Sequence, residues 1–189
     1  IEANEIQFES FIFSGGEPHI KINPNFNLSE SITITHRINS FNDLGLLCIA
    51  VDALKRMNAK VENLIIPYFP AARQDRLMIK GEPLTVKVYA DIINTLYFKK
   101  VIIFDAHSEV TPAVVNNCEV VSNKKFIEKV IQEIGNNVLL ISPDGGALKK
   151  IYKVSEFLGG IEVIECSKSR DVKSGKLSGF KVYSENLEG

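Results

Sequence analysis

Short, strongly apolar runs recur through the middle of the chain, and they are separated by segments with a helical period. The runs lie at 61–66, 101–104, 138–141 and 161–166. Runs of this length are typical of strands buried in a parallel sheet. The helical period predicts helices over 43–58, 85–96, 123–134 and 147–158. Strands that alternate with helices predict an α/β fold in which helices flank a parallel sheet.

The helical segments also predict which side chains are buried. The first helix is expected to bury Leu44, Leu47, Val51, Leu54 and Met57. The second is expected to start at a Thr85 cap and to bury Val88, Ile92 and Leu96, with Tyr89 and Ile93 alongside. Either Ser40 or Asn42 can cap the first helix, because both have short polar side chains that accept from free amides.

The first forty residues predict short strands at 6–12, 20–22 and 31–38. The third of these alternates apolar with polar side chains over most of its length, which indicates a strand with one face exposed to solvent. Between the first two lies 13–19, where Gly15, Gly16 and Pro18 predict a turn. Glu17 in this turn can hold a ligand, although a plain hairpin turn is the simpler interpretation.

Composition narrows the class of protein. The 189 residues are 45% hydrophobic and 24% charged, with a formal net charge of −1, so no basic field is available to recruit nucleic acid. No apolar run is long enough to span a membrane, and the first residues do not form a secretion signal. Cys48, Cys118 and Cys166 are odd in number and widely spaced, so we expect neither a disulfide framework nor a zinc site, and a reduced, cytoplasmic setting.

Polar clusters follow the carboxyl ends of the predicted strands. They are Arg73–Arg76, Asp105 with His107, Asp144, and Lys168 with Arg170. Since the carboxyl ends of parallel strands share one sheet edge, we expect these clusters to converge. A carboxylate and an imidazole can hold a divalent cation, and lysine and arginine can neutralise phosphates. This combination favours phosphoryl transfer.

Each cluster also has a simpler explanation. The 73–76 segment can be a solvated loop with an Asp–Arg pair, and His107 can be a hydrogen-bonded turn residue. Asp144 can merely cap the helix that begins at 147, and Lys168 and Arg170 can be surface charges. The sequence lacks GxxxxGK[ST], GxGxxG, HExxH, GxSxG and CxxC. The absence of these motifs argues against a P-loop kinase, a Rossmann dehydrogenase, a zincin and an α/β-hydrolase.

Several short motifs stand in a fixed order along the chain. They are VDALKR (51–56), IPY (66–68), ARQDR (72–76), EPLTVK (82–87), FDAHS (104–108), SPDGG (142–146) and KSR (168–170). Together they resemble the N-terminal half of the ribose-phosphate pyrophosphokinase family, the synthetases of phosphoribosyl pyrophosphate. The resemblance covers nearly the whole chain, and its most specific parts are 68–76 and 142–146.

The resemblance implies a phosphoribosyltransferase-like fold with two similar domains. The first would occupy residues 1–135, and residues 136–189 would be the beginning of the second. It also implies an enzyme of nucleotide biosynthesis, which transfers the diphosphoryl group of ATP to ribose 5-phosphate with Mg²⁺ and releases AMP. The family further implies a homo-oligomer.

Residue roles follow from the same resemblance. The ATP-binding residues would be Phe13, Glu17, Arg73, Gln74, Asp75 and His107. His107 and Asp144 would bind the Mg²⁺ of the Mg²⁺–ATP complex. Lys168 and Arg170 would be catalytic, stabilising the transferring group from a loop that closes over the site and excludes water.

The sequence departs from the family pattern at three places. Gly15 stands where the family usually carries an aspartate, and Ser169 stands where an arginine is common. The acidic DDxxDTGGT run that binds the sugar phosphate is absent, so we expect an incomplete enzyme without its acceptor site. A non-catalytic regulatory relative and a free-standing nucleotide-binding domain are the alternatives.

Overall fold

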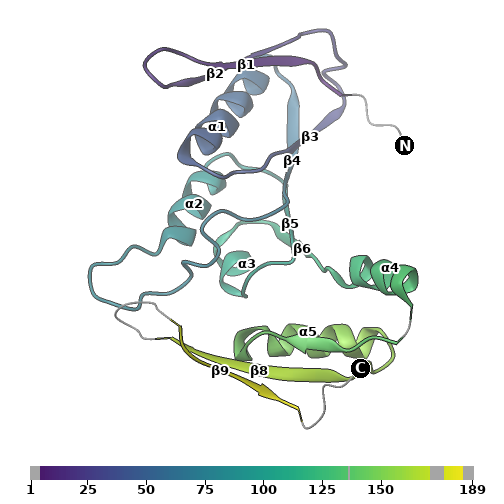
Figure 1. Cartoon of the computed structure of the whole chain (residues 1–189). Helices are drawn as coiled ribbons and strands as arrows, with labels where there is room; N and C mark the ends of the chain where they lie inside the picture. Colours follow the sequence, from purple (N-terminus) through teal and green to yellow (C-terminus); the bar gives the residue numbers. More distant parts are fainter. Residues whose placement is uncertain (1–4, 136, 171–176, 185–189) are drawn as a thin grey trace. The chain divides into compact units, whose positions relative to one another are not determined.

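The computed structural model describes residues 5–135, 137–170 and 177–184, without the side chains of Arg170 and Ser178. The chain divides into two compact units, Ile1–Ser122 and Asn123–Gly189, and each is described by itself. Both units contain parallel strands connected through helices (Figure 1). The predicted α/β class is therefore confirmed.

The first unit is built on a four-stranded parallel sheet. Its strands are β3 (Ser31–Thr35), β4 (Lys60–Ile66), β5 (Lys100–Phe104) and β6 (Cys118–Val121), in that order. The connecting helices are α1 (Phe41–Arg56), α2 (Thr85–Asn94) and α3 (Val110–Val114). Leu64, Ile66 and Ile103 at the centre of the sheet are fully buried. The short elements α3 and β6 were not predicted, because five and four residues are too few to establish a period.

Helix α1 follows its predicted pattern closely. Leu44, Leu47, Val51 and Leu54 are buried, as the stripe predicted, whereas Met57 is the C-terminal cap. Ser40 is the N-terminal cap, and its hydroxyl accepts from the amide of Asp43 at 3.2 Å. The Asp43 carboxylate accepts in return from the Ser40 amide at 2.9 Å, which completes a capping box.

Helix α2 is rotated relative to the prediction. Its buried residues are Val86, Tyr89, Ala90 and Ile93, whereas Val88 is 43% exposed. The helix ends at Asn94, so Leu96 lies beyond it, and no side chain caps its first turn. Tyr89 and Ile93 are buried as predicted, and Ile92 and Leu96 are half-buried against the core, so the prediction was wrong for Val88 and it missed Val86 and Ala90. Val86, Ala90 and Ile93 lie on one face because they are spaced by four and three residues, and the small side chain of Ala90 allows close packing there.

Strands β1 (Phe8–Ile12) and β2 (Pro18–Ile22) form an antiparallel hairpin, as the turn signals predicted. Its turn is closed by a hydrogen bond from the Phe13 amide to the Glu17 carbonyl at 2.9 Å. All five residues of β1 are exposed, although three of them are apolar. The hairpin therefore presents apolar side chains to solvent.

The second unit contains a three-stranded sheet with two helices. Its elements are α4 (Lys124–Ile134), β7 (Leu140–Ser142), α5 (Gly145–Phe157), β8 (Val163–Arg170) and β9 (Leu177–Tyr183). Strands β7 and β8 are parallel, and β9 pairs antiparallel with β8. The Lys124 ammonium lies 5.5 Å from the ring centre of Phe157 on α5, which links α4 to this unit. The structure divides between Ser122 and Asn123, and the predicted domain boundary after residue 135 stays a prediction.

Lys168 and Arg170 lie in a strand, not in the loop that was predicted for them. Strand β8 continues to Arg170, and Lys168 pairs with Phe180 of β9. The prediction ended the strand at Cys166 because the polar run 167–170 looked like a loop, but β9 supplies the backbone partners that keep it extended. The sequence, with its glycines and serines, also predicts a loop over 171–179, but residues 171–176 lie outside the described residues and 177–179 begin β9.

None of the helices in the described part of the chain combines the length and the apolar character needed to cross a membrane.

Candidate functional site

The loops that follow β4 and β5 lie at the same edge of the first sheet. The two strands are parallel neighbours, and Ile66 near the end of one pairs with Ile103 of the other. The loop after β4 carries Arg73–Arg76, and the loop after β5 carries Asp105–Ser108. The convergence predicted for these two clusters is therefore observed within the first unit.

The loop after β4 is anchored by apolar side chains and presents polar ones. Phe69 and Ala72 are 3% and 2% exposed, whereas Arg73 and Gln74 are exposed. Ala71 has a φ of 53°, and its carbonyl accepts from the Gln74 amide at 2.8 Å, so the backbone turns sharply here. The buried anchors fix the loop and leave the guanidinium of Arg73 and the amide of Gln74 available to a ligand.

Asp75 is buried within the same loop. Its Oδ1 accepts from Arg76 Nε at 3.2 Å, and its side chain is only 3% exposed. The nearby Ser108 hydroxyl is the main cause that holds the pKa of the Asp75 carboxyl below its ordinary value, against the opposing effect of burial. Asp75 thus lies between the two loops, and its role as an ATP contact stays a prediction.

The loop after β5 presents His107 at the surface. Asp105 has a φ of 43°, and its amide donates to the Val121 carbonyl at 2.9 Å, which extends the hydrogen bonding between β5 and β6. His107 is exposed, and Ser108 beside it accepts from the Val110 amide at 3.3 Å. Ser108 was not predicted as a site residue, although its hydroxyl stands next to the predicted ligand His107 in the sequence.

A hollow of about 390 Å³ adjoins the loop after β4. It is lined by the first residues of α1 and α2 together with the loop, and Gln74, Tyr68 and Thr85 are among the lining side chains. The rings of Phe41 and Tyr89 stack on its wall, with centres 4.7 Å apart. Its volume and its mixture of aromatic and polar side chains suit a flat organic group.

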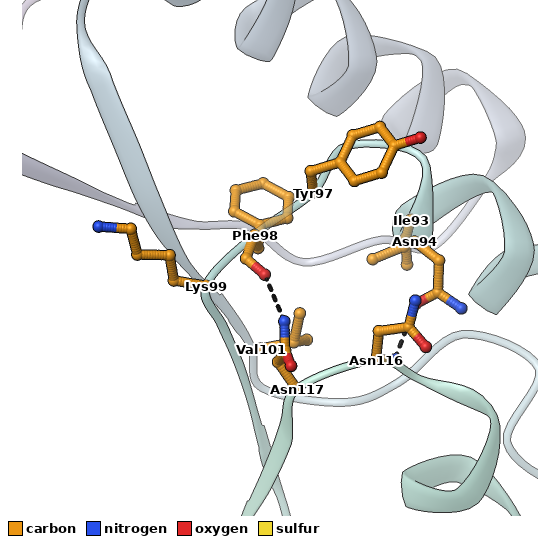
Figure 2. Close-up of a pocket in the computed structure, with 8 residues that line it drawn as sticks. All are labelled: Ile93, Asn94, Tyr97, Phe98, Lys99, Val101, Asn116 and Asn117. Atoms are coloured by element: carbon orange, nitrogen blue, oxygen red, sulfur yellow. Dashed lines mark hydrogen bonds between the residues drawn. The ribbon is translucent and has the colours of Figure 1, made fainter.

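A smaller hollow of about 200 Å³ lies where α2 gives way to β5 (Figure 2). The Asn117 side chain donates to the Phe98 carbonyl at 3.0 Å. The Asn94 side chain accepts from the Asn116 amide at 2.8 Å and donates to the Val114 carbonyl at 3.0 Å. Because these amides already join the surrounding chain segments, the hollow is explained as a structural junction.

In the second unit, Asp144 and Lys168 are in contact. Asp144 caps α5, because its Oδ1 accepts from the Ala147 amide at 3.0 Å. Its Oδ2 forms an ion pair with the Lys168 ammonium, and this interaction is the main cause that lowers the pKa of the Asp144 carboxyl. The simpler explanation of Asp144 as a cap is confirmed, but only one of its two oxygens is used by the cap.

The hairpin turn places Phe13 beside an aromatic cluster. The rings of Phe11, Phe13 and His19 lie within 5.0–5.3 Å of one another, and Phe13 is 51% exposed. The Glu17 carboxylate lies over Gly15, where a Cβ atom would stand 2.5 Å from Glu17 Oε2. The turn therefore presents a ring and a carboxylate together, and the missing side chain of Gly15 leaves the space that Glu17 occupies.

The predicted site residues thus form separate groups. Arg73, Gln74, Asp75 and His107 lie in the two loops of the first unit, Phe13 and Glu17 in its hairpin, and Asp144 and Lys168 in the second unit. The Mg²⁺ role predicted for His107 and Asp144 concerns residues of different units, and it stays a prediction. Among the described residues there is no cluster of three or more His, Cys, Asp or Glu that could hold a metal.

Comparisons with known proteins agree with the motif order. Residues 1–96 match the N-terminal domain of ribose phosphate pyrophosphokinase. Ribose-phosphate pyrophosphokinase 2 of Enterococcus faecalis is 32% identical over 154 residues, which cover 77% of this chain and 47% of that protein. The ribose-phosphate pyrophosphokinase of Bacillus subtilis is 31% identical over 152 residues, with the same coverage of 77% and 47%.

A similar fold occurs in the crystal structure of phosphoribosylpyrophosphate synthetase from Mycobacterium smegmatis. The TM-score is 0.78 at 22% sequence identity, and the match covers 97% of this chain and 60% of that one. This chain spans about half the length of the curated relatives that it matches. Since the domain match covers the first half of the sequence and the relatives align over three quarters of it, the chain belongs to the ribose-phosphate pyrophosphokinase family.

Proposed function

We propose that this protein is a ribose-phosphate diphosphokinase of nucleotide biosynthesis. It transfers the diphosphoryl group of ATP to the 1-hydroxyl of ribose 5-phosphate and gives phosphoribosyl pyrophosphate and AMP. The observation that carries the proposal is the pair of loops at one sheet edge, in which exposed Arg73 and Gln74 lie beside the His107 loop. The names of the relatives support the same reaction class.

In this proposal the first unit binds ATP. The Arg73 guanidinium pairs with phosphate oxygens, which its planar fork of donors suits. Gln74 borders the hollow with the stacked rings of Phe41 and Tyr89, and a flat base suits that wall. His107 approaches the triphosphate from the neighbouring loop, and Asp75 supports both loops from beneath.

Phe13 and Glu17 contact the adenine, and they do so from the hairpin of a neighbouring copy in a homo-oligomer. The hairpin supports this role because its aromatic side chains are exposed and lie beside a carboxylate. A ring can stack on the base, and a carboxylate can accept from an exocyclic amine.

Asp144 of the second unit and His107 of the first are the residues that would bind Mg²⁺. The fit is supported at Asp144 Oδ2, where the Lys168 ammonium already occupies a cation position, and a carboxylate oxygen is a ligand that Mg²⁺ favours. When it is bound, Mg²⁺ neutralises charge on the triphosphate. Lys168 and Arg170 of β8 stabilise the transferring group by presenting cations to it.

An AMP-release assay tests the proposal. The full protein that the gene encodes is supplied with ATP and Mg²⁺, with and without ribose 5-phosphate. We expect AMP only when the acceptor is present, and a fall in kcat of roughly 10²–10³-fold in Lys168→Ala, since one electrostatic contact to the reacting group is lost. Lys181→Ala in β9 is the matched control, because it removes the same charge from the same sheet.

Two other outcomes are informative. ATP binding without acceptor-dependent AMP would contradict the enzyme and favour a regulatory relative that binds nucleotide without turnover. An equal loss of activity in Lys168→Ala and Lys181→Ala would show that Lys168 has no special role in the reaction.

A further inference from the structure

Both carboxylate oxygens of Asp144 are engaged in the described structure. Oδ1 accepts from the Ala147 amide at 3.0 Å, and Oδ2 pairs with the Lys168 ammonium. The Asp144 side chain is 23% exposed, and that of Lys168 is 35% exposed. A metal ion that reaches Oδ2 must therefore take the place of the ammonium group.

We propose that Lys168 competes with Mg²⁺ for Oδ2 of Asp144, so that arrival of the metal releases the Lys168 ammonium to face the anionic substrate. The inference rests on the proposed function, because that function assigns Asp144 to the metal. The inference gives Lys168 a second role. Before the metal binds, the Lys168 ammonium pairs with Oδ2 of Asp144, and the metal then displaces the ammonium from this oxygen.

The carboxylate is fixed, and the ammonium is free to move away from it. Asp144 is the N-terminal cap of α5, and the Ser142 hydroxyl donates to its carbonyl at 2.9 Å, which holds the backbone as well. Lys168 has its backbone held by pairing with Phe180, but its side chain has four flexible methylenes. Rotation of the stem is thus enough to withdraw the ammonium while both strands stay in place.

The exchange changes the net charge of the Asp144–Lys168 site. The carboxylate and the ammonium together are neutral, so the paired state offers no net attraction to a polyanion. A divalent ion on the carboxylate leaves one net positive charge, and the released ammonium adds another. The two cations repel each other until a triphosphate lies between them, so metal, lysine and nucleotide favour one another only when all three are present.

Metal affinity without nucleotide provides the test. Mn²⁺ serves as the probe, and free Mn²⁺ is counted by electron paramagnetic resonance over a titration of the full chain. We expect Lys168→Met to bind Mn²⁺ at least about fivefold more tightly than the wild type, because the competing cation is gone. Lys181→Met is the matched control, and it removes the same charge from neighbouring β9. Asp144→Asn should abolish this binding.

The outcomes separate the inference from the proposed function. Mn²⁺ binding that depends on Asp144 but is unchanged in Lys168→Met would overturn the competition and leave the metal role of Asp144 intact. An equal gain in Lys168→Met and Lys181→Met would also overturn it, because a general change in charge would then suffice. If no binding depends on Asp144 in any variant, both the competition and the metal assignment are wrong.

A second measurement does not depend on the variants folding. In wild-type protein with ¹⁵N-labelled lysine, the side-chain signal of Lys168 should move toward that of an exposed lysine as Mg²⁺ is added. The signal of Lys181 should stay in place. A Lys168 signal that does not respond while Mg²⁺ binds would contradict the inference.

Discussion

Asp75 has the most enclosed carboxylate of the site loops, with 3% of its side chain exposed. Its Oδ2 is buried and has no partner at ordinary hydrogen-bond geometry among the described residues, while Oδ1 holds Arg76. From the sequence alone, the four residues of 73–76 could not be distinguished, because a run of adjacent polar residues does not indicate which side chain turns inward. Burial of Phe69 and Ala72 fixes the loop and turns Asp75 inward, away from its exposed neighbours Arg73 and Gln74.

This environment predicts a dependence of stability on pH. The pKa of Asp75 is lower in the folded state than the unfolded value of about 3.9. The ionised carboxylate therefore stabilises the protein above that value, and the contribution is lost as the pH falls through the folded pKa. We expect Asp75→Asn to lower the free energy of unfolding by about 1–3 kcal/mol at pH 7 and by less near pH 3, where the stabilisation has begun to be lost.

Urea denaturation at pH 7, 5 and 3 measures the difference. Asp91→Asn on α2 is the control, since it removes an exposed carboxylate that pairs with Lys87. A difference between wild type and Asp75→Asn that stays constant from pH 7 to pH 3 would count against the stabilising role of the charge.

At the scale of elements, helices with a strong period and a cap were predictable, and short or two-sided elements were not. The stripe of α1 and its Ser40 cap are both present in the structure. The face of α2 was predicted only in part, with Tyr89 and Ile93 correct, because Ala90 counts little toward an apolar pattern yet lies fully buried. The extent of β8 depends on pairing with β9, and a partner strand that is distant in sequence leaves no local signal.

The cap of α1 gives a prediction for Ser40→Ala. The variant loses the hydroxyl that accepts from the Asp43 amide, and we expect its free energy of unfolding to fall by about 1 kcal/mol. Chemical denaturation measures the change, and Ser10→Ala in exposed β1 is the control for loss of a surface hydroxyl. Equal stability of the two variants would mean that the capping box contributes nothing measurable.

Tyr97 gives a second prediction at this scale. It lies just beyond α2 with a φ of 59° and is 82% exposed, so it adopts a left-handed conformation with little burial in return. Asparagine tolerates this conformation better, and we expect Tyr97→Asn to raise the melting temperature by a few degrees, equivalent to about 0.5–1 kcal/mol. Its ring lies 5.9 Å from the Lys55 ammonium, so Lys55→Met tests separately how much that contact contributes.

At the scale of the whole molecule, the core lies in the first unit. Its cluster extends from Ile38 to Val115 and includes the central residues of β4 and β5. In the described part of the second unit, the buried apolar side chains are Ile131, Val154, Ile164 and Cys166. The motif order predicted the family and the class of fold, but it gave no measure of how much core each unit has, because burial depends on contacts between distant segments.

We therefore expect the second unit to open more readily than the first. Amide hydrogens of β7 and α5 should exchange with solvent sooner than those of β4 and β5, since fewer apolar contacts hold them. Hydrogen–deuterium exchange with peptide mass spectrometry measures this order directly. Equal protection of the two sets of peptides would contradict the expectation.

The Glu17 carboxylate over Gly15 has a consequence for how this turn can evolve. Any side chain at position 15 would displace that carboxylate, since its Cβ would lie 2.5 Å from Oε2. An aspartate at 15 would therefore move Glu17 and repel it at the same time. Because Oε2 is the tip of an exposed and flexible side chain, a change of rotamer at Glu17 is enough to make that room, and position 15 can therefore accept a side chain without a second substitution.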